Sequence, residues 1–246
     1  MWPILFQSSY LTLFSYPFLM GIAWALGYFL SEEKLRSVGI SNAQLPTLFL
    51  GCFVSSWVFA KLFFLMTLPS YYLKNLTPYP SFWMGGGLVF YGGLLGGLLF
   101  LWIYVGKLKK YPWTNLPHFL PGLTMAHAVG RVGCLLAGCC YGVESHSLFA
   151  VEIDGVSRLA VPLFESLFLI LCSVYFWKET QKNAGVQHLL QYILFYAVFR
   201  FLIEYLRGDE IRGVYWDLFS TSQIISMAMI LSVIAIVRWK KIKLFS

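Results

Sequence analysis

Two arginines stand in stretches of the sequence that are otherwise apolar enough to lie in a bilayer. Arg131 is flanked by Gly130 and Gly133 in the run AHAVGRVGCLLAGCCYG, and Arg200 lies in the run YAVFRFLIEYLR. A guanidinium group stays charged in a protein, so each of these arginines needs a carboxylate, an anion or water beside it. The forked N–H donors of arginine suit a phosphate or a carboxylate. The two stretches therefore predict one polar, anion-binding site inside a helical membrane protein.

The second run carries a polar stripe. Tyr196, Arg200, Glu204 and Arg207 stand at positions i, i+4, i+8 and i+11, which share one face of a helix. An Arg200–Glu204 pair at i, i+4 forms naturally, but it does not explain the tyrosine and the second arginine. Glu165, early in another apolar segment, also needs a partner. We expect the two glutamates to hold the arginines in place or to take a proton from an incoming nucleophile.

Three cysteines follow Arg131 closely. With His127, the thiols of Cys134, Cys139 and Cys140 could supply four metal ligands. Their spacing is not C-x-x-C, however, and adjacent cysteines rarely both reach one ion. We therefore expect the cysteines to pack as small apolar residues, with no metal site and no cofactor. A thiol-redox membrane protein built on these cysteines remains a further hypothesis.

The sequence offers no standard nucleophile motif. G-x-S-x-G, H-E-x-x-H and G-x-x-x-x-G-K-[ST] do not occur in it. The run GGGLVFYGGLLGG has glycines at the spacing that lets membrane helices approach closely, and the hydroxyl of Tyr91 among them needs a partner, which is either structural or a substrate. If the chain is an enzyme, its nucleophile comes from a substrate.

Composition limits the class of protein. The chain has 246 residues, 59% hydrophobic and 12% charged, with a mean hydropathy of +0.70. Soluble domains carry about a quarter charged residues. The net charge of +7 does not indicate nucleic acid, because the basic residues lie at the ends of apolar segments and are not interleaved on one exposed face. A positive-inside bias accounts for them.

The elements that must position the polar residues are apolar segments of helical length, each long enough to cross a bilayer. They predict an all-α, polytopic membrane protein with about seven transmembrane helices in a single domain, residues 1–246, with a small external cap around residues 143–160. The distribution of Lys and Arg places the N-terminus outside, as a retained first span, and the C-terminus in the cytoplasm. The predicted segments are Tyr10–Leu30, Pro46–Leu68, Gly85–Val105, Phe119–Tyr141, Val161–Trp177, Gln187–Leu206 and Phe219–Val237.

These stretches together resemble the prolipoprotein diacylglyceryl transferases of bacteria, in a cysteine-containing branch, over nearly the whole chain. The matching elements, in order, are Tyr16, the run FYGGLLGG, AHAVGRVGCLLAGCCYG, LFES around Glu165, YAVFRFLIEYLRGDE, and STSQIIS at Ser220–Ser226. Seven spans with the N-terminus outside also agree with this family.

The resemblance implies transfer of a diacylglyceryl group from phosphatidylglycerol to the lipobox cysteine thiol in the signal peptide of a preprolipoprotein. A thioether forms and glycerol phosphate leaves, in the cytoplasmic (inner) membrane of a bacterium. Arg131 and Arg200 would neutralise the phosphate, with Glu204 and Tyr196 orienting Arg200. The implied catalytic residues are Arg131, Arg200, Glu204 and Tyr91, and the implied substrate-binding residues are Arg131, Arg200, Tyr196, Tyr16, Glu165, Gly130 and Gly133.

Some positions depart from the family pattern. Tyr91 stands where many members carry a histidine that is proposed as the base, and Cys134, Ala137 and Cys139 replace Asn, Asn and Glu. A tyrosine of ordinary pKa is a poor base at neutral pH. These departures motivate the alternative of a non-catalytic paralogue that binds or moves an anionic phospholipid.

Overall fold

The computed structural model describes residues 1–8, 12–67, 89–108, 113–182, 184–209, 214–215 and 219–245. These residues are mostly α-helical, and five helical stretches among them are long and apolar enough to cross a membrane. The chain belongs to a multi-pass helical class on that ground. It divides into two compact units, one made of Met1–Ser31 with Leu116–Ser246 and the other of Glu32–Asn115.

The smaller unit is a pair of packed helices with the end of a third. Its glycine-rich helix lies directly against its partner. The elements are the last part of α1 (Ser15–Ser37), α2 (Gln44–Thr67), α5 (Phe90–Leu101) and the π-helical turn η1 (Trp102–Leu108).

Glycines set the distance between α2 and α5. A Cβ atom on Gly96 would lie 2.5 Å from the carbonyl oxygen of Ser55, so only glycine fits there. The Ser55 hydroxyl donates to the Gly96 carbonyl at 2.8 Å, which ties the two helices together. The small-residue spacing in this run thus serves close helix packing.

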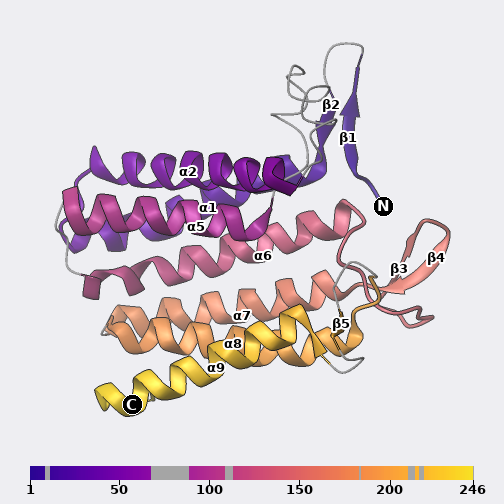
Figure 1. Cartoon of the computed structure of the whole chain (residues 1–246). Helices are drawn as coiled ribbons and strands as arrows, with labels where there is room; N and C mark the ends of the chain where they lie inside the picture. The colour runs from indigo at the N-terminus through magenta and orange to yellow at the C-terminus, as the bar shows by residue number, and fades with distance from the viewer. Residues whose placement is uncertain are drawn as a thin grey trace. The chain divides into compact units, whose positions relative to one another are not determined.

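The larger unit holds most of the helices and all three strand pairs of the described residues. Its helices are the first part of α1, α6 (Leu120–Leu136) after a 3₁₀ turn η2 (Trp113–Phe119), α7 (Val161–Lys182), α8 (Val186–Ile203) with a 3₁₀ end η3 (Glu204–Leu206), and α9 (Thr221–Lys240). Helix α6 packs on α7 and α8 on α9, so the four run side by side (Figure 1).

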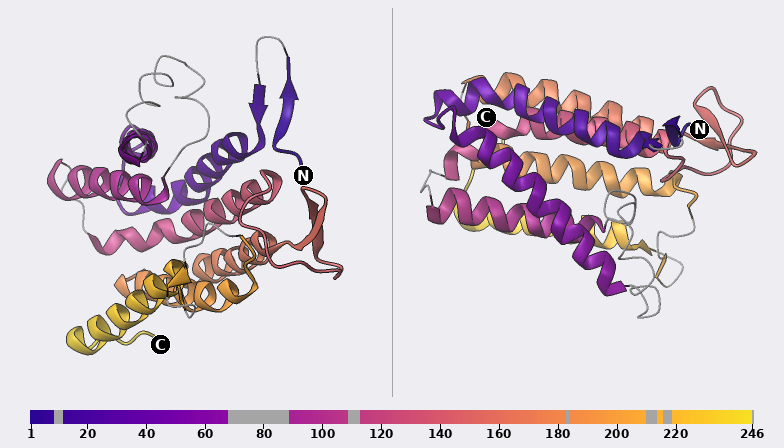
Figure 2. Two further views of the ribbon diagram at one scale, coloured as in Figure 1. Left: turned by 45° about the vertical axis from the view of Figure 1, so that its right-hand side comes forward. Right: turned by 90° about the horizontal axis from the view of Figure 1, so that it is seen from above.

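Short antiparallel hairpins gather at one end of this unit, where α6 ends and α7 begins (Figures 1 and 2). The strands are β1 (Ile4–Gln7) with β2 (Thr12–Phe14), β3 (Ala150–Ile153) with β4 (Val156–Leu159), and β5 (Val214–Tyr215) with β6 (Phe219–Ser220). The β3–β4 turn places Asp154 and Gly155 at φ +51° and +78°. This is the left-handed pair that a two-residue hairpin favours. The hairpin lies inside the segment that the sequence predicts as a cap.

Local signals account for where the site helices start. Ser220 and Gln223 form a capping box at the start of α9: the Gln223 N–H donates to Ser220 Oγ at 3.2 Å, and the Ser220 N–H donates to Gln223 Oε1 at 2.9 Å. The S-x-x-Q motif is therefore a helix N-terminus.

In the core, Leu120 and Phe176 are fully buried and join α6 to α7.

The predicted segments overlap the seven α-helices found within the described residues, with one informative difference. The fourth segment was expected to run to Tyr141, but α6 ends at Leu136. Gly138 then adopts φ +73° and Cys140 φ +61°, so the chain turns back after the helix. The expectation of one continuous helix through the cysteines is therefore wrong.

The start of the first predicted segment, Tyr10, lies outside the described residues, and α1 begins at Ser15. The single-domain organisation and the orientation in the membrane stay predictions.

Candidate functional site

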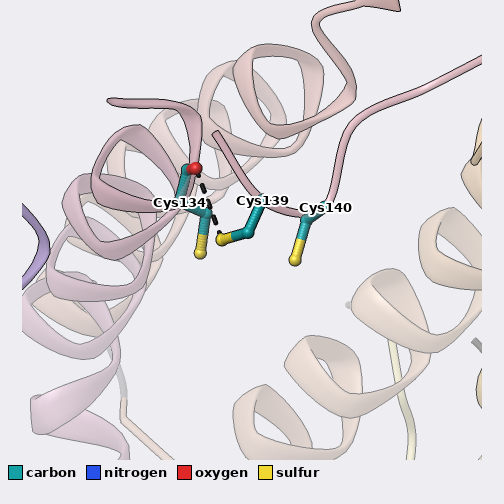
Figure 3. A group of neighbouring side chains, drawn as sticks. All are labelled: Cys134, Cys139 and Cys140. Carbon is teal, nitrogen blue, oxygen red and sulfur yellow. Dashed lines mark hydrogen bonds between the residues drawn. The ribbon is translucent and has the colours of Figure 1, made fainter. Parts of the chain in front are cut away.

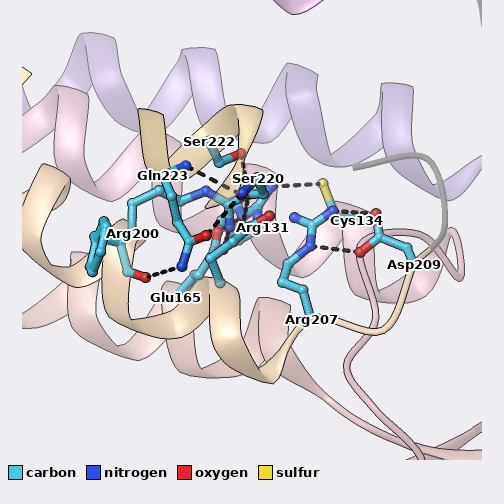
Figure 4. Close-up of polar contacts among 11 residues, drawn as sticks. Arg131, Cys134, Glu165, Arg200, Arg207, Asp209, Ser220, Ser222 and Gln223 are labelled. Atoms are coloured by element: carbon cyan, nitrogen blue, oxygen red, sulfur yellow. Dashed lines mark hydrogen bonds and ion pairs between the residues drawn. The ribbon is translucent and has the colours of Figure 1, made fainter. Parts of the chain in front are cut away.

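A buried carboxylate joins two arginines from different helices. Glu165 lies in the second turn of α7 with its side chain 0% exposed. Its Oε2 is ion-paired to Nε of Arg131 from α6, and its Oε1 accepts from Nη1 of Arg200 on α8 at 2.6 Å (Figure 4). Residues separated widely along the chain thus meet as one charged cluster, which we call the Glu165 cluster: Arg131, Glu165, Arg200 and Glu204.

Arg200 has two further partners. Its Nη2 lies 2.7 Å from Oε2 of Glu204 and donates to the hydroxyl of Ser222 at 3.0 Å. Glu204 is 1% exposed and begins the 3₁₀ turn η3, directly after α8. Ser222 comes from the first turn of α9. The guanidinium of Arg200 is therefore held from three helices and has little freedom to reorient.

Arg131 has fewer strong partners than Arg200. Its Nη1 approaches Sγ of Cys134 at 3.7 Å, a long contact to a weak acceptor, and its Nε pairs with Glu165. Its side chain is 14% exposed. A guanidinium carries five N–H donors. The Glu165 cluster can thus offer hydrogen bonds to an anion while its own two carboxylates balance its two cations.

The three cysteines after Arg131 converge (Figure 3). The Sγ atoms of Cys134, Cys139 and Cys140 all lie within 4.8 Å of one another, and all three thiols are free. Hydrogen bonds from the Cys134 and Cys139 thiols lower the pKa of Cys140, and the charges of Arg131 and Arg207 lower it further against the effect of burial. Although Cys139 and Cys140 are adjacent in sequence, both thiols lie close to that of Cys134, and the backbone at Cys140 is left-handed with φ +61°.

Arg207 does not continue the helical stripe. The helix has ended, and Arg207 has an extended backbone with φ −75° and ψ 137°. Its Nε donates to Oδ1 of Asp209 at 2.7 Å, and its Nη2 pairs with Oδ2 of the same carboxylate. Backbone bridging between Gly142 and Arg207 joins this strand to the segment that follows the cysteines.

Aromatic side chains lie next to the Glu165 cluster. The ring of Tyr196 packs against that of His127, with 4.9 Å between centroids, and His127 Nδ1 is 3.3 Å from the hydroxyl of Tyr192. Tyr16, at the start of α1, lies against Gly133. His127 is therefore occupied in packing and hydrogen bonding and is not part of the cysteine group.

The remaining predicted site residues have other surroundings. Nearest to a Cβ atom built on Gly130 is Met20 of α1, at 3.6 Å, and nearest to one built on Gly133 is Tyr16, at 3.2 Å. Gly133 thus lets α1 approach α6 closely, whereas a Cβ atom at position 130 would make only an ordinary van der Waals contact. Tyr91 lies in α5 of the smaller unit, and its side chain lies outside the described part of the chain. Its role stays a prediction.

Sequence reasoning did not single out Ser222 and Asp209, which contact the arginines directly. Ser222 was visible only as part of the STSQIIS run, where a serine in a first helical turn is ordinary. Asp209 follows Arg207 by two residues, and only the extended backbone there allows the two side chains to meet.

Comparison with known proteins agrees with this geometry. The family model of prolipoprotein diacylglyceryl transferases matches residues 3–239. The phosphatidylglycerol–prolipoprotein diacylglyceryl transferase 2 of Clostridium perfringens is 28% identical over 244 residues, covering 95% of this chain and 93% of that protein. The phosphatidylglycerol–prolipoprotein diacylglyceryl transferase of Finegoldia magna is 30% identical over 230 residues, with 92% and 91% covered. That of Dehalococcoides mccartyi is 32% identical over 190 residues, with 71% and 70% covered. The chain belongs to the prolipoprotein diacylglyceryl transferase family.

Proposed function

We propose that this chain transfers the diacylglyceryl group of phosphatidylglycerol to the thiol of a lipobox cysteine in the signal peptide of a preprolipoprotein. The products are a thioether-linked lipid on the peptide and glycerol phosphate. The protein acts in the cytoplasmic membrane of a bacterium, with its N-terminus outside. The names of its relatives, which specify phosphatidylglycerol and a prolipoprotein, support this substrate pair.

The observation that carries the proposal is the pairing of Arg131 and Arg200 through Glu165. Two guanidinium groups from α6 and α8 are fixed side by side, largely out of water, by a carboxylate of α7. Fixed cations in a water-poor site stabilise charge that grows in a transition state more strongly than mobile ones do. The phosphate of phosphatidylglycerol gains such charge when its ester bond to the diacylglyceryl carbon breaks.

The reaction needs few groups from the protein. The thiol of the peptide releases its proton to water, and its sulfur forms a bond to the glyceryl carbon. The bond from that carbon to the phosphate oxygen breaks, and its electron pair stays on the oxygen. Arg131, which has one carboxylate partner, supplies further guanidinium N–H donors to the phosphate. Arg200, positioned by Glu204 and Ser222, neutralises the leaving group from the other side.

Other residues surround the lipid in this proposal. Tyr196 and Tyr16 line the headgroup and orient the arginines, with Gly130 and Gly133 next to them on α6, where Gly133 lets α1 approach closely. Tyr91 acts on the thiol or the headgroup as a polar partner.

A transfer assay tests the proposal. The purified protein is mixed with phosphatidylglycerol and a lipobox peptide, and the peptide mass is the readout. We expect a diacylglyceryl mass increase with the wild type and a loss of about 10²–10³-fold in rate for Arg131→Ala or Arg200→Ala. Arg36→Ala is the matched control, because it removes an arginine from an exposed pair with Glu32. Full activity in both site variants would overturn the assigned roles.

A second candidate function is lipid binding without transfer, and the tyrosine at position 91 favours it, since tyrosine is a weak base. Phosphatidylglycerol retained by the wild type but not by Arg131→Ala, with no thioether product, would select this alternative.

A further inference from the structure

The three thiols of Cys134, Cys139 and Cys140 lie close together at the end of α6. Cys134 is buried, Cys140 is half-buried and Cys139 is exposed, so the group reaches from the helix interior to the surface. The turn that builds it is ordered by hydrogen bonds: the Cys139 N–H donates to the Cys134 carbonyl at 3.0 Å, and the Cys139 thiol lies 3.4 Å from the same oxygen.

The spacing of the sulfur atoms suits a single soft cation. Zinc–sulfur bonds of about 2.3 Å place three thiolates about 3.8 Å apart, against the 4.8 Å that bounds the present group. Small side-chain rotations close that difference, and the exposed Cys139 has room for one. Three thiolates select Zn²⁺ or Cu⁺ over hard cations. A zinc ion with three protein ligands has an open fourth position, as catalytic zinc sites do.

The position of the group says what the fourth ligand would be. Cys134 Sγ lies 3.7 Å from Nη1 of Arg131, so the group of thiols lies next to the guanidinium that would hold the lipid phosphate. The substrate that must meet the lipid there is a thiol, and a thiol bound to zinc loses its proton outright.

The described part of the site lacks another uncommitted base. Glu165 and Glu204 are both ion-paired to arginine, and His127 is hydrogen-bonded to Tyr192. A metal ion beside Arg131 would supply the means to deprotonate the substrate thiol, which these residues do not.

We propose that Cys134, Cys139 and Cys140 bind one Zn²⁺ whose fourth position takes the lipobox cysteine as a thiolate. This inference rests on the proposed transfer function. The peptide thiol releases its proton to water when it binds the ion. Its sulfur then forms the bond to the glyceryl carbon, the carbon–oxygen bond to phosphate breaks, and glycerol phosphate leaves with that electron pair. No oxidant or reductant takes part.

The test uses the full chain in detergent, loaded with Zn²⁺, washed and analysed for metal by mass spectrometry. We expect about one zinc per chain in the wild type and in the control Cys52→Ser, whose thiol lies in α2 of the other unit. Cys139→Ser, at the exposed position, and the double variant with Cys140→Ser lose the metal while keeping the thermal unfolding temperature of the metal-free wild type. Zinc retained in the double variant, or none in the wild type, overturns the site.

Cobalt then tests the role of the ion. With Co²⁺ in place of Zn²⁺, we expect sulfur-to-cobalt absorption that rises when a lipobox peptide is added and does not rise with the same peptide carrying serine at that position. An unchanged spectrum with the cysteine peptide overturns the thiolate role.

The transfer assay separates this failure from that of the function. A wild type that transfers lipid but holds no zinc contradicts the metal site and leaves the proposed function standing. A wild type that holds zinc but transfers no lipid contradicts the proposed function and the thiolate role together.

Discussion

The larger unit contains two groups in which arginine pairs with carboxylate, and they are built in opposite ways. The Glu165 cluster draws its members from α6, α7 and α8, and its carboxylates are buried. The Arg207–Asp209 pair joins residues two apart in one short segment after α8, with side chains 7% and 15% exposed. The first group depends on the whole helix arrangement, whereas the second is nearly local.

The difference separates a candidate functional site from an ion pair that only holds a local segment in place. Burying two cations and two carboxylates carries a desolvation cost that their mutual attraction offsets only with good geometry, so such a group adds little net stability. Removing one partner, however, leaves a buried charge alone. The Arg207–Asp209 pair is also largely buried, but it holds one cation and one carboxylate, and the carboxylate keeps 15% of its side chain exposed, so water can reach it when its partner is removed. We therefore expect substitutions in the two groups to differ in both stability and activity.

The largest effect is expected for Glu165→Ala. It leaves two guanidinium groups without their shared carboxylate, which costs about 3–5 kcal/mol in the free energy of unfolding and abolishes transfer. Thermal unfolding in detergent and the transfer assay measure the two effects. Glu165→Gln keeps the shape and one acceptor oxygen, but its amide NH2 group cannot accept from the second arginine and the charge is lost. A stable, active Glu165→Ala protein would remove the distinction between the two groups.

Arg207→Ala should have a smaller effect. It removes two charge-assisted hydrogen bonds to Asp209, worth about 1.5–3 kcal/mol when buried and less here because Asp209 is partly exposed. The loop after α8 loosens while Arg131 and Arg200 keep their partners. Proteolysis of that loop and the transfer rate are the measurements, and a loss of transfer as large as that of Arg200→Ala would contradict the comparison.

Gln223→Ala tests how α9 is held beside Arg200. The substitution breaks the capping box with Ser220 and should lower stability by about 1 kcal/mol. Ser222 then positions Arg200 less well, so a modest decrease in transfer rate accompanies it. Gln223→Glu, which keeps the capping acceptor, is the control. An unchanged unfolding temperature in Gln223→Ala would show that the cap has no energetic role.

The smallest effect is expected at Arg36, which pairs with Glu32 on an exposed stretch of α1. Arg36→Ala should change the free energy of unfolding by no more than about 0.5 kcal/mol, because water screens the pair. Salt titration of the wild type and the variant measures this, and a large destabilisation would mean that exposed pairs matter as much as the Glu165 cluster.

Much of the helix arrangement could be predicted from sequence, since apolar length is a direct requirement of the bilayer. The Arg200–Glu204 pair followed from helical spacing alone. That Glu165 bridges two arginines did not, because pairing between α6, α7 and α8 depends on which helices become neighbours. The sequence predicted that Glu165 holds an arginine in place, but not that its two oxygens pair with Arg131 and Arg200 at once.

The cysteines show a feature of the site that the sequence could not predict. Their spacing predicted packing residues, because it is not C-x-x-C and adjacent cysteines rarely both reach one ion. The helix ends at Leu136, and the turn through Gly138 and Cys140 reverses the chain. A left-handed cysteine carries no sequence signal, so the convergence of the sulfurs became visible only in three dimensions.

The position of the Glu165 cluster along its helices has a consequence for how a lipid arrives. Arg131, Glu165 and Arg200 lie only five, four and three residues from the nearest ends of α6, α7 and α8. At a rise of about 1.5 Å per residue, they sit about 4–8 Å inside those ends, far from the middle of a hydrocarbon core about 30 Å thick. In the proposed function, a phospholipid of the adjacent leaflet would carry its phosphate at nearly the same depth. It would then reach the arginines by lateral diffusion in the plane of the membrane, with its acyl chains remaining in the hydrocarbon core.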